Sequence, residues 1–258
     1  MESLPSRELL ALYDAQMRAN PPPEPGMAYE LAGGVLRGTG NFNFIFHSDL
    51  TASSADAAIA EQARQFSNPP RELQWKVYDH DQPFDIAGRL LAAGFQIQEP
   101  ETFMVLRLSD DRPLAAQSPG IEIRRVSDHS GLGDYVGVGS EVFGSDESWR
   151  IEAYSPRLDD PTLALYVAYD GAKPVSSGRL EMPKGRSFAS LWGGGTLEAY
   201  RGRGIYKALV DARAREAARA GFAYLTVDAR DTSRPILERL GFACLTRVRD
   251  FVLNKAAP

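Results

Sequence analysis

A short stretch of this 258-residue chain combines glycine with cationic side chains. It reads Arg201-Gly202-Arg203-Gly204-Ile205-Tyr206-Lys207. Ile205, Ala208 and Leu209 recur with the spacing of one helix face, which predicts that a helix begins here. The first N–H groups of a helix lack partners within it, and the helix dipole adds positive charge at that end. Together with the arginines, these groups predict a site for an anion, most naturally a phosphate.

Three known motifs place a phosphate at such a turn. A P-loop requires Gly-Lys-Ser/Thr at the entry to the helix, and this stretch has no such run. A dinucleotide-binding turn requires a third glycine where Lys207 stands, although Asp228, at the end of the next predicted strand, keeps this alternative open. The third motif, Arg/Gln-x-x-Gly-x-Gly/Ala, belongs to the GNAT acyltransferases. The stretch from Arg201 resembles it closely, with one departure at Tyr206, where the family usually has glycine or alanine.

The elements around this turn support the resemblance by their order. An apolar run, residues 188–192, predicts a strand before the turn, and the helix after it is expected to end at Gly221. A further predicted strand, residues 222–227, is followed by a short helix that Gly241-Phe242 closes. Over residues 120–258 this order resembles the core of the GNAT superfamily. The resemblance implies an acetyl-CoA-dependent N-acetyltransferase that acts on an amine of a small molecule or a peptide.

The first half of the chain contains a similar pattern. A predicted strand, residues 73–78, precedes a predicted helix, residues 85–93, and Gly94-Phe95 closes this helix as Gly241-Phe242 closes the later one. The similarity predicts an internal repeat at the scale of a domain. Two unrelated α/β segments that share a common helix ending are the alternative.

The predicted fold class is therefore α/β (α+β), with tandem GNAT-like domains, each a mixed central sheet flanked by helices. Residues 1–112 are expected to form a degenerate N-terminal domain, residues 109–120 a polar linker, and residues 120–258 the acetyltransferase domain. The N-terminal half has no equivalent anion-binding turn, because Arg37–Gly40 precedes a strand-like run and no helix. The two strands predicted on either side of it are residues 29–36 and 41–47.

The resemblance also implies which residues hold the cosubstrate. The turn would bind the pyrophosphate of acetyl-CoA, and the end of the preceding strand would pair with the extended pantetheine arm. The positions assigned to acetyl-CoA are Gly195, Thr196, Leu197, Arg201, Gly202, Arg203, Gly204, Ile205, Tyr206, Lys207 and Ser233.

Catalysis requires that the acceptor amine, protonated at neutral pH with a pKa near ~10, loses a proton before it attacks the thioester. A carboxylate is the usual base, and the sequence offers Glu181 and Asp228 near the ends of predicted strands. Many GNAT enzymes place a tyrosine acid where this chain has Leu237. We therefore expect direct transfer that depends on positioning and a base rather than on an acid at position 237. A catalytically silent CoA-binding module is the alternative.

Composition limits the partners and the location. The formal net charge of −5 argues against nucleic acid or an anionic membrane as the default partner. No apolar run approaches the ~20 residues of a membrane span. The single cysteine, Cys244, is expected in the core and is typical of a reducing compartment, so we expect a cytoplasmic protein. No group of residues has the spacing of metal ligands, and the sequence leaves the oligomeric state open.

Overall fold

The computed structural model describes residues 6–109 and 118–254, and these form two compact units. Unit 1 takes the described residues up to Met104 together with two later segments, Asp228–Arg234 and the part from Cys244 onward. Unit 2 comprises Val105–Val227 and Pro235–Ala243. The predicted linker lies outside the described residues except at positions 109 and 118–120, so the predicted domain boundary stays a prediction.

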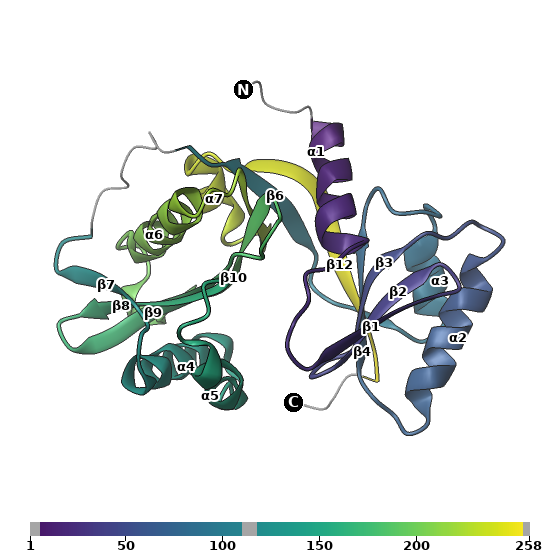
Figure 1. The fold of residues 1–258 in the computed structure, drawn as a ribbon, viewed down its shortest axis with the longest axis horizontal. Helices are drawn as coiled ribbons and strands as arrows, with labels where there is room; N and C mark the ends of the chain where they lie inside the picture. The colour runs from purple at the N-terminus through teal and green to yellow at the C-terminus, as the bar shows by residue number, and fades with distance from the viewer. Residues whose placement is uncertain (1–5, 110–117, 255–258) are drawn as a thin grey trace. The chain divides into compact units, whose positions relative to one another are not determined.

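Unit 1 is a sheet with helices packed against it (Figure 1). Its strands, in the order in which they pair, are β1 (Met27–Ala32), β2 (Val35–Gly40), β3 (Phe44–Ser48), β4 (Leu73–Tyr78) and β12 (Ala243–Leu253), and β12 also pairs with β5 (Gln96–Ile97). Its helices are α1 (Ser6–Tyr13), continued by a π-helical turn (Asp14–Arg18), α2 (Ala55–Ser67) and α3 (Ile86–Ala92). Strands β3 and β4 pair in parallel, whereas β2 pairs antiparallel with β1 and β3, and β12 with β4 and β5. The sheet is therefore mixed, as predicted.

The single strand predicted over residues 29–36 is wrong, because the chain reverses within it. Gly33 and Gly34 have φ values of 58° and 79°, and this two-residue turn joins β1 to β2 in an antiparallel hairpin. The stretch Arg37–Gly40, predicted to separate two strands, belongs to β2 itself. Within β2, Gly38 is required by packing, since a Cβ there would lie 2.6 Å from the Phe46 ring.

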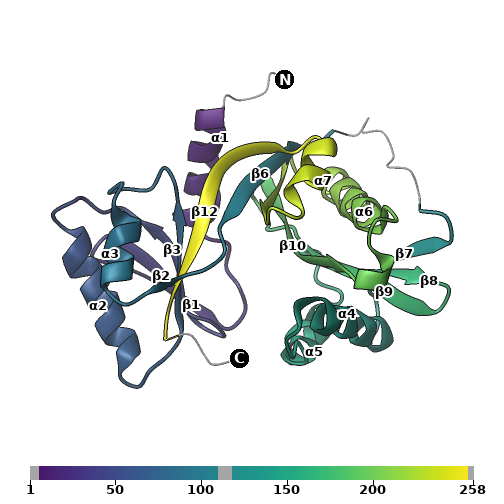
Figure 2. The same cartoon turned by 180° about the vertical axis from the view of Figure 1, so that it is seen from behind.

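Alternation along β4 gives the sheet of unit 1 two different faces. Leu73, Trp75 and Val77 join the buried cluster formed with α2 and α3, which lie together against the strands (Figure 2). Because successive side chains of a strand point to opposite faces, Lys76 and Tyr78 face the other way. Tyr78 packs there with Phe103 of β6 (Glu101–Arg107) and with Tyr13 of α1.

Unit 2 places helices on both faces of its sheet. Its strands, in pairing order, are β7 (Ile121–Arg125), β8 (Leu163–Asp170), β9 (Lys173–Glu181), β10 (Phe188–Thr196) and β11 (Tyr224–Ala229). Its helices are α4 (His129–Phe143), α5 (Trp149–Tyr154), continued by a 3₁₀ turn (Ser155–Arg157), α6 (Ile205–Arg219) and α7 (Arg234–Arg239). Helices α4 and α5 cover one face, and α6 covers the opposite face (Figure 1). The pair of β10 and β11 is parallel, whereas β7 to β10 pair antiparallel.

The helix endings that suggested a repeat have the same geometry in both units. Gly94 after α3 and Gly241 after α7 have φ values of 91° and 89°. The next residue then donates its N–H back into the helix: Phe95 to the Leu90 carbonyl at 3.1 Å, and Phe242 to the Leu237 carbonyl at 3.0 Å. Leu90 and Leu237 are both completely buried, so Leu237 has a packing role like that of Leu90.

Candidate functional site

The glycine–arginine turn opens a 15-residue helix, as its sequence predicts. The strand β10 ends at Thr196, a 3₁₀ turn follows (Glu198–Tyr200), and α6 begins at Ile205. Gly202 and Gly204 have φ values of 75° and 78°, which a residue with a side chain rarely adopts. Gly204 is the N-cap, and no side chain caps the helix there. The first amides of α6 are thus presented at a turn that also carries cations, which suits a pyrophosphate.

The arginines of the turn are held differently. Arg201 donates its Nε to the Thr196 carbonyl at 3.3 Å, which ties the turn to the end of β10. Arg203 is half exposed, and its guanidinium lies 3.4 Å from the Asp170 carboxylate and 5.0 Å from the centre of the Tyr200 ring. Ion pairs this exposed are weak, so Arg203 can turn toward an anionic ligand at small cost.

A β-bulge interrupts β10 shortly before the turn. Trp192 pairs with Arg179 and Gly195 with Ser177, so Gly193 and Gly194 together oppose the single residue Gly178. The parallel pairing of β10 with β11 runs from Phe188 to Ser190 and stops before the bulge. The bulged part of β10 is therefore held on its β9 side, and the run from Gly193 to Thr196 leaves backbone for an extended ligand on the other side.

The three residues assigned to the pantetheine arm lie at the end of β10 and just beyond it. The N–H of Leu197 already donates to the Val175 carbonyl at 2.9 Å, and the Gly195 carbonyl accepts from the Ser176 hydroxyl at 2.7 Å. These two groups face β9, so pairing with the arm would use the backbone groups of Gly194 and the N–H of Thr196, since the Thr196 carbonyl already accepts from Arg201. Gly195 has a second role, because a Cβ there would lie 2.3 Å from Val142 of α4.

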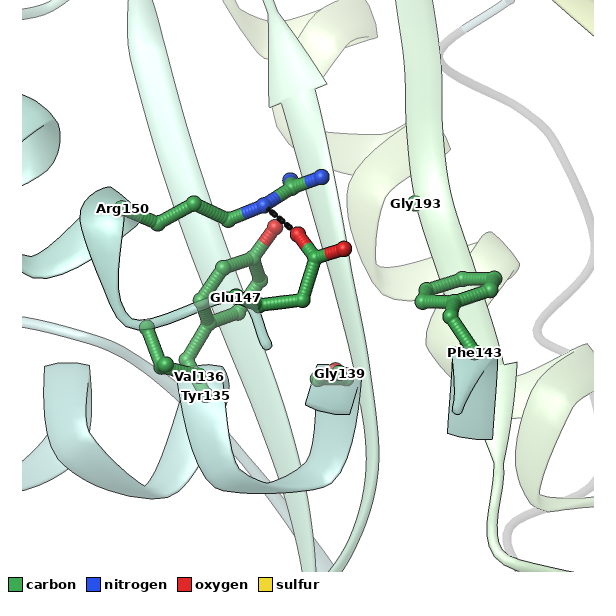
Figure 3. Close-up of a pocket in the computed structure, with 8 residues that line it drawn as sticks. Tyr135, Val136, Gly139, Phe143, Glu147, Arg150 and Gly193 are labelled. Atoms are coloured by element: carbon green, nitrogen blue, oxygen red, sulfur yellow. Dashed lines mark hydrogen bonds and ion pairs between the residues drawn. The ribbon is translucent and has the colours of Figure 1, made fainter. Parts of the chain in front are cut away.

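A pocket lies on the α4 and α5 side of the bulge (Figure 3). The residues that line it are Tyr135, Val136, Gly139, Phe143, Glu147, Arg150, Ser177 and Gly193. Because Gly193 has no side chain, the pocket extends to the backbone of β10. A Cβ at this position would lie 3.7 Å from the Tyr135 hydroxyl and 3.8 Å from the Arg150 guanidinium. Near the pocket, Trp149 and Trp192 are 58% and 39% exposed, which leaves aromatic surface available to a ligand.

Three polar side chains of this pocket, Tyr135, Glu147 and Arg150, were not predicted from the sequence. Glu147 accepts from Arg150 Nε (Figure 3). It also accepts from the Ser145 hydroxyl at 2.9 Å. Burial raises the pKa of the Tyr135 hydroxyl, which therefore stays protonated and can donate a proton. Glu147 and Arg150 are only three residues apart in the chain, but their proximity to Tyr135 of α4 depends on tertiary packing, which no local spacing in the sequence indicates.

The residues predicted as catalytic bases are both paired with cations. Glu181, on β9 in unit 2, lies 3.2 Å from the Arg179 guanidinium. Asp228 groups with unit 1, where its carboxylate lies 2.6 Å from Lys76 Nζ, and both side chains are nearly buried. Ser233, assigned to acetyl-CoA, also groups with unit 1 and donates its hydroxyl to the Arg230 carbonyl at 3.1 Å. The turn, the bulge and the pocket belong to unit 2.

Among the residues that the structure describes, no group of three or more potential ligands could hold a metal ion. Within the same ranges, none of the helices has both the length and the apolar character that a membrane crossing requires.

Comparison with known proteins agrees with this geometry. Among solved structures, a GCN5-related N-acetyltransferase from Kribbella flavida superposes with a TM-score of 0.74 at 13% identity, covering 99% of this chain and 98% of that one. A functionally unknown conserved protein from Staphylococcus epidermidis gives 0.67 at 16% identity, with coverage of 88% and 93%. A tandem GNAT protein from the clavulanic acid biosynthesis pathway gives 0.65 at 13% identity, with coverage of 97% and 94%. A search of curated proteins gives no match.

These likenesses show the fold, and the glycine turn that opens α6 agrees with it: this chain has the fold of a GNAT protein with two GNAT-like halves, as predicted. Residues 134–242 match the model of the Acetyltransferase (GNAT) family. Proteins of this family generally use acetyl-CoA for N-acetylation.

Proposed function

We propose that this protein transfers an acetyl group from acetyl-CoA to an amine of a small molecule or a peptide. One observation carries the proposal: two positive-φ glycines, Gly202 and Gly204, form the turn that opens α6, and Arg201 and Arg203 add cations next to the first amides of the helix. A pyrophosphate bound there would place the pantetheine arm along the bulged end of β10. The thioester would then lie near Gly193, beside the pocket that would receive the amine.

The pocket supplies groups for both proton transfers of the reaction. We assign the role of general base to Glu147, because its carboxylate lines the pocket. Glu181 and Asp228, the bases proposed from the sequence, are the alternatives. The lone pair of the amine attacks the carbonyl carbon, a C–N bond forms, and the C–S bond breaks as CoA leaves as a thiolate. To Tyr135, which lines the same pocket, we assign the protonation of that sulfur.

Calorimetry with acetyl-CoA tests the phosphate site. Gly204→Glu places a bulky negative side chain at the N-cap, and we expect at least a 100-fold loss of affinity. A matched control is Gly221→Glu at the other end of α6, where φ is 86° and a Cβ would have open space. Both variants add the same charge at a glycine with a positive φ. A Cβ at Gly204 would in addition lie 3.2 Å from the Ser118 hydroxyl, so the folding of both variants is checked before their affinities are compared. Equal binding by the two folded variants would refute the assignment.

A catalytically silent CoA-binding module is the second candidate, and turnover distinguishes it. Release of CoA from acetyl-CoA should be measured with separate sets of small amines, amino acids, aminoglycosides and peptides. An enzyme gives amine-dependent CoA release that saturates, whereas a binding module gives tight calorimetric binding and no release. A melting shift with NAD in place of CoA would favour the dinucleotide-binding alternative.

A further inference from the structure

A buried arginine lies in the middle of α6. Arg213 is 1% exposed, and it donates Nε to the Leu209 carbonyl at 3.2 Å and Nη1 to the Arg179 carbonyl at 3.0 Å. Within the described ranges, no ion pair joins its guanidinium to a carboxylate. Transferring a cation from water to the protein interior without a counter-ion costs free energy, so an unpaired buried charge in this position requires an explanation.

The guanidinium of Arg213 lies directly against the bulge of β10. A Cβ on Gly178 would lie 2.6 Å from Nη1, and a Cβ on Gly194 would lie 3.2 Å from Nη2. Both residues are in the bulge, where Gly178 opposes Gly193 and Gly194. The two strands therefore have no side chain at the place where the cation packs, and only backbone separates it from the opposite face of the sheet.

The groups that face Arg213 and the bulge do not neutralise its charge. Three tyrosines interact electrostatically with the Arg213 guanidinium: Tyr206 of α6, Tyr135 of α4 and Tyr166 of β8. Burial raises the pKa of Tyr206, so its hydroxyl stays neutral. The other charged groups near the bulge already form pairs of opposite charge: Arg150 with Glu147, and Arg179 with Glu181. Tyr206 occupies the position where related turns have glycine or alanine. Its ring lies 3.2 Å from where a Cβ on Gly194 would be, so the large side chain is accommodated because Gly194 has none.

We propose that Arg213 is a positioning residue that stabilises the negative charge formed on acyl-CoA at the bulge. The inference rests on the proposed function, since it needs the thioester near Gly193. When the amine attacks, an electron pair moves onto the carbonyl oxygen. When the C–S bond then breaks, a pair leaves with the sulfur as thiolate, and the proton of the amine goes to the base. A permanent cation in a dry environment, held behind the backbone, favours both charged species.

The same charge should lower the pKa of the CoA thiol, and this can be measured without an acceptor. The ultraviolet absorbance of the thiolate is followed against pH for the CoA complex, with the complex of desulfo-CoA as blank. The protein carries Cys244→Ser, so that its own thiol does not absorb. We expect the bound thiol to titrate about one unit below the ~8.5 of a free thiol. Arg213→Met should remove this shift while leaving the calorimetric affinity for CoA within about threefold.

Arg215→Met is the matched control, because Arg215 lies on the same helix and is paired with Asp211 at 2.9 Å. It should leave the thiol pKa unchanged. Arg213→Lys keeps a charge and should retain part of the shift, so it replaces the methionine variant if that variant does not fold. A wild-type thiol that titrates as in free CoA, or a shift that survives in Arg213→Met, would overturn the proposal. Absence of CoA binding by the wild type would instead refute the proposed function.

Discussion

Lys76 Nζ and the Asp228 carboxylate form an ion pair of 2.6 Å in which both side chains are about nine-tenths buried. Asp250, the cross-strand partner of Lys76, adds a second carboxylate at 3.8 Å. Burial alone lowers the pKa of Lys76, but the two carboxylates outweigh burial and hold the pKa above its ordinary value. Lys76 therefore compensates two buried negative charges in unit 1.

Replacing Lys76 with methionine should destabilise the protein strongly. The change leaves Asp228 and Asp250 buried without their cation, and breaking a buried pair in this way costs about 3–5 kcal/mol. Urea unfolding at neutral pH measures the loss. The control Arg249→Met removes a more exposed pair between β12 and Asp79, the residue after β4, and should cost less than about 1 kcal/mol. Asp228→Asn should restore part of the stability of Lys76→Met; if it does not, the two residues are not energetically coupled.

Glu101 should make the stability of the protein depend on pH. Burial raises its pKa to about 7, with Lys76 opposing the shift and Asp228 and Asp250 adding to it. The folded state thus binds this proton more tightly than the unfolded state, so stability is greatest below the ordinary glutamate pKa and falls as pH rises toward 7. Glu101→Gln should remove this fall and stabilise the protein by about 1–3 kcal/mol at pH 8.

Thermal melts of wild type and Glu101→Gln between pH 4.5 and 8 check the prediction. Glu99→Gln is the control, because Glu99 lies near the same Arg230 but is 67% exposed. The difference between wild type and Glu101→Gln should widen with pH, whereas the Glu99 variant should follow wild type. A constant difference across the range would show that Glu101 has an ordinary pKa in the folded protein.

The sequence predicts the glycine turn correctly because its signals are local. A positive φ at Gly202 and Gly204, and the helix spacing after them, both follow from residues within one turn of the chain. The same locality explains the closing glycines after α3 and α7. The hairpin of β1 and β2 was missed because Gly33-Gly34 and Gly38-x-Gly40 are competing turn signals in the sequence, and Gly38 instead serves packing against Phe46.

Features that depend on tertiary packing were not predictable in this way. Tyr135 and Arg150 reach Gly193 only because α4 and α5 cover one face of the sheet, and Arg213 reaches Gly194 because α6 covers the other. Cys244, predicted in the core, is exposed. Burial along β12 is concentrated in its second half, where it pairs with β4, and the beginning of the strand is largely exposed.

Gly195 should tolerate a methyl group only if α4 gives way. A Cβ at Gly195 would lie 2.3 Å from Val142 Cγ1, so Gly195→Ala is expected to cost about 1–3 kcal/mol of unfolding free energy. Val142→Ala removes the clashing atom, and the double variant should recover most of the loss. Gly137→Ala in α4, where a Cβ has open space, should instead stabilise the protein by about 0.5–1 kcal/mol. Additive losses in the double variant would contradict this contact.

Glu147→Gln should slow acetyl transfer without weakening acetyl-CoA binding. The substitution keeps the size of the side chain but removes the proton acceptor, and loss of a general base typically costs about 10²–10⁴-fold in rate. Steady-state kinetics with an amine from the CoA-release screen, together with calorimetry, separates kcat from binding.

Glu181→Gln and Asp228→Asn, measured in parallel, decide between the three carboxylates. Glu181 does not line the pocket, so its substitution should alter kcat by less than about tenfold if Glu147 is the base. Asp228→Asn should mainly reduce stability, because it removes the partner of Lys76. Unfolding curves recorded beside the kinetics distinguish these effects. If Glu147→Gln keeps the wild-type kcat and either of the other variants loses it with CoA binding intact, the base is the carboxylate proposed from the sequence and the pocket assignment is wrong.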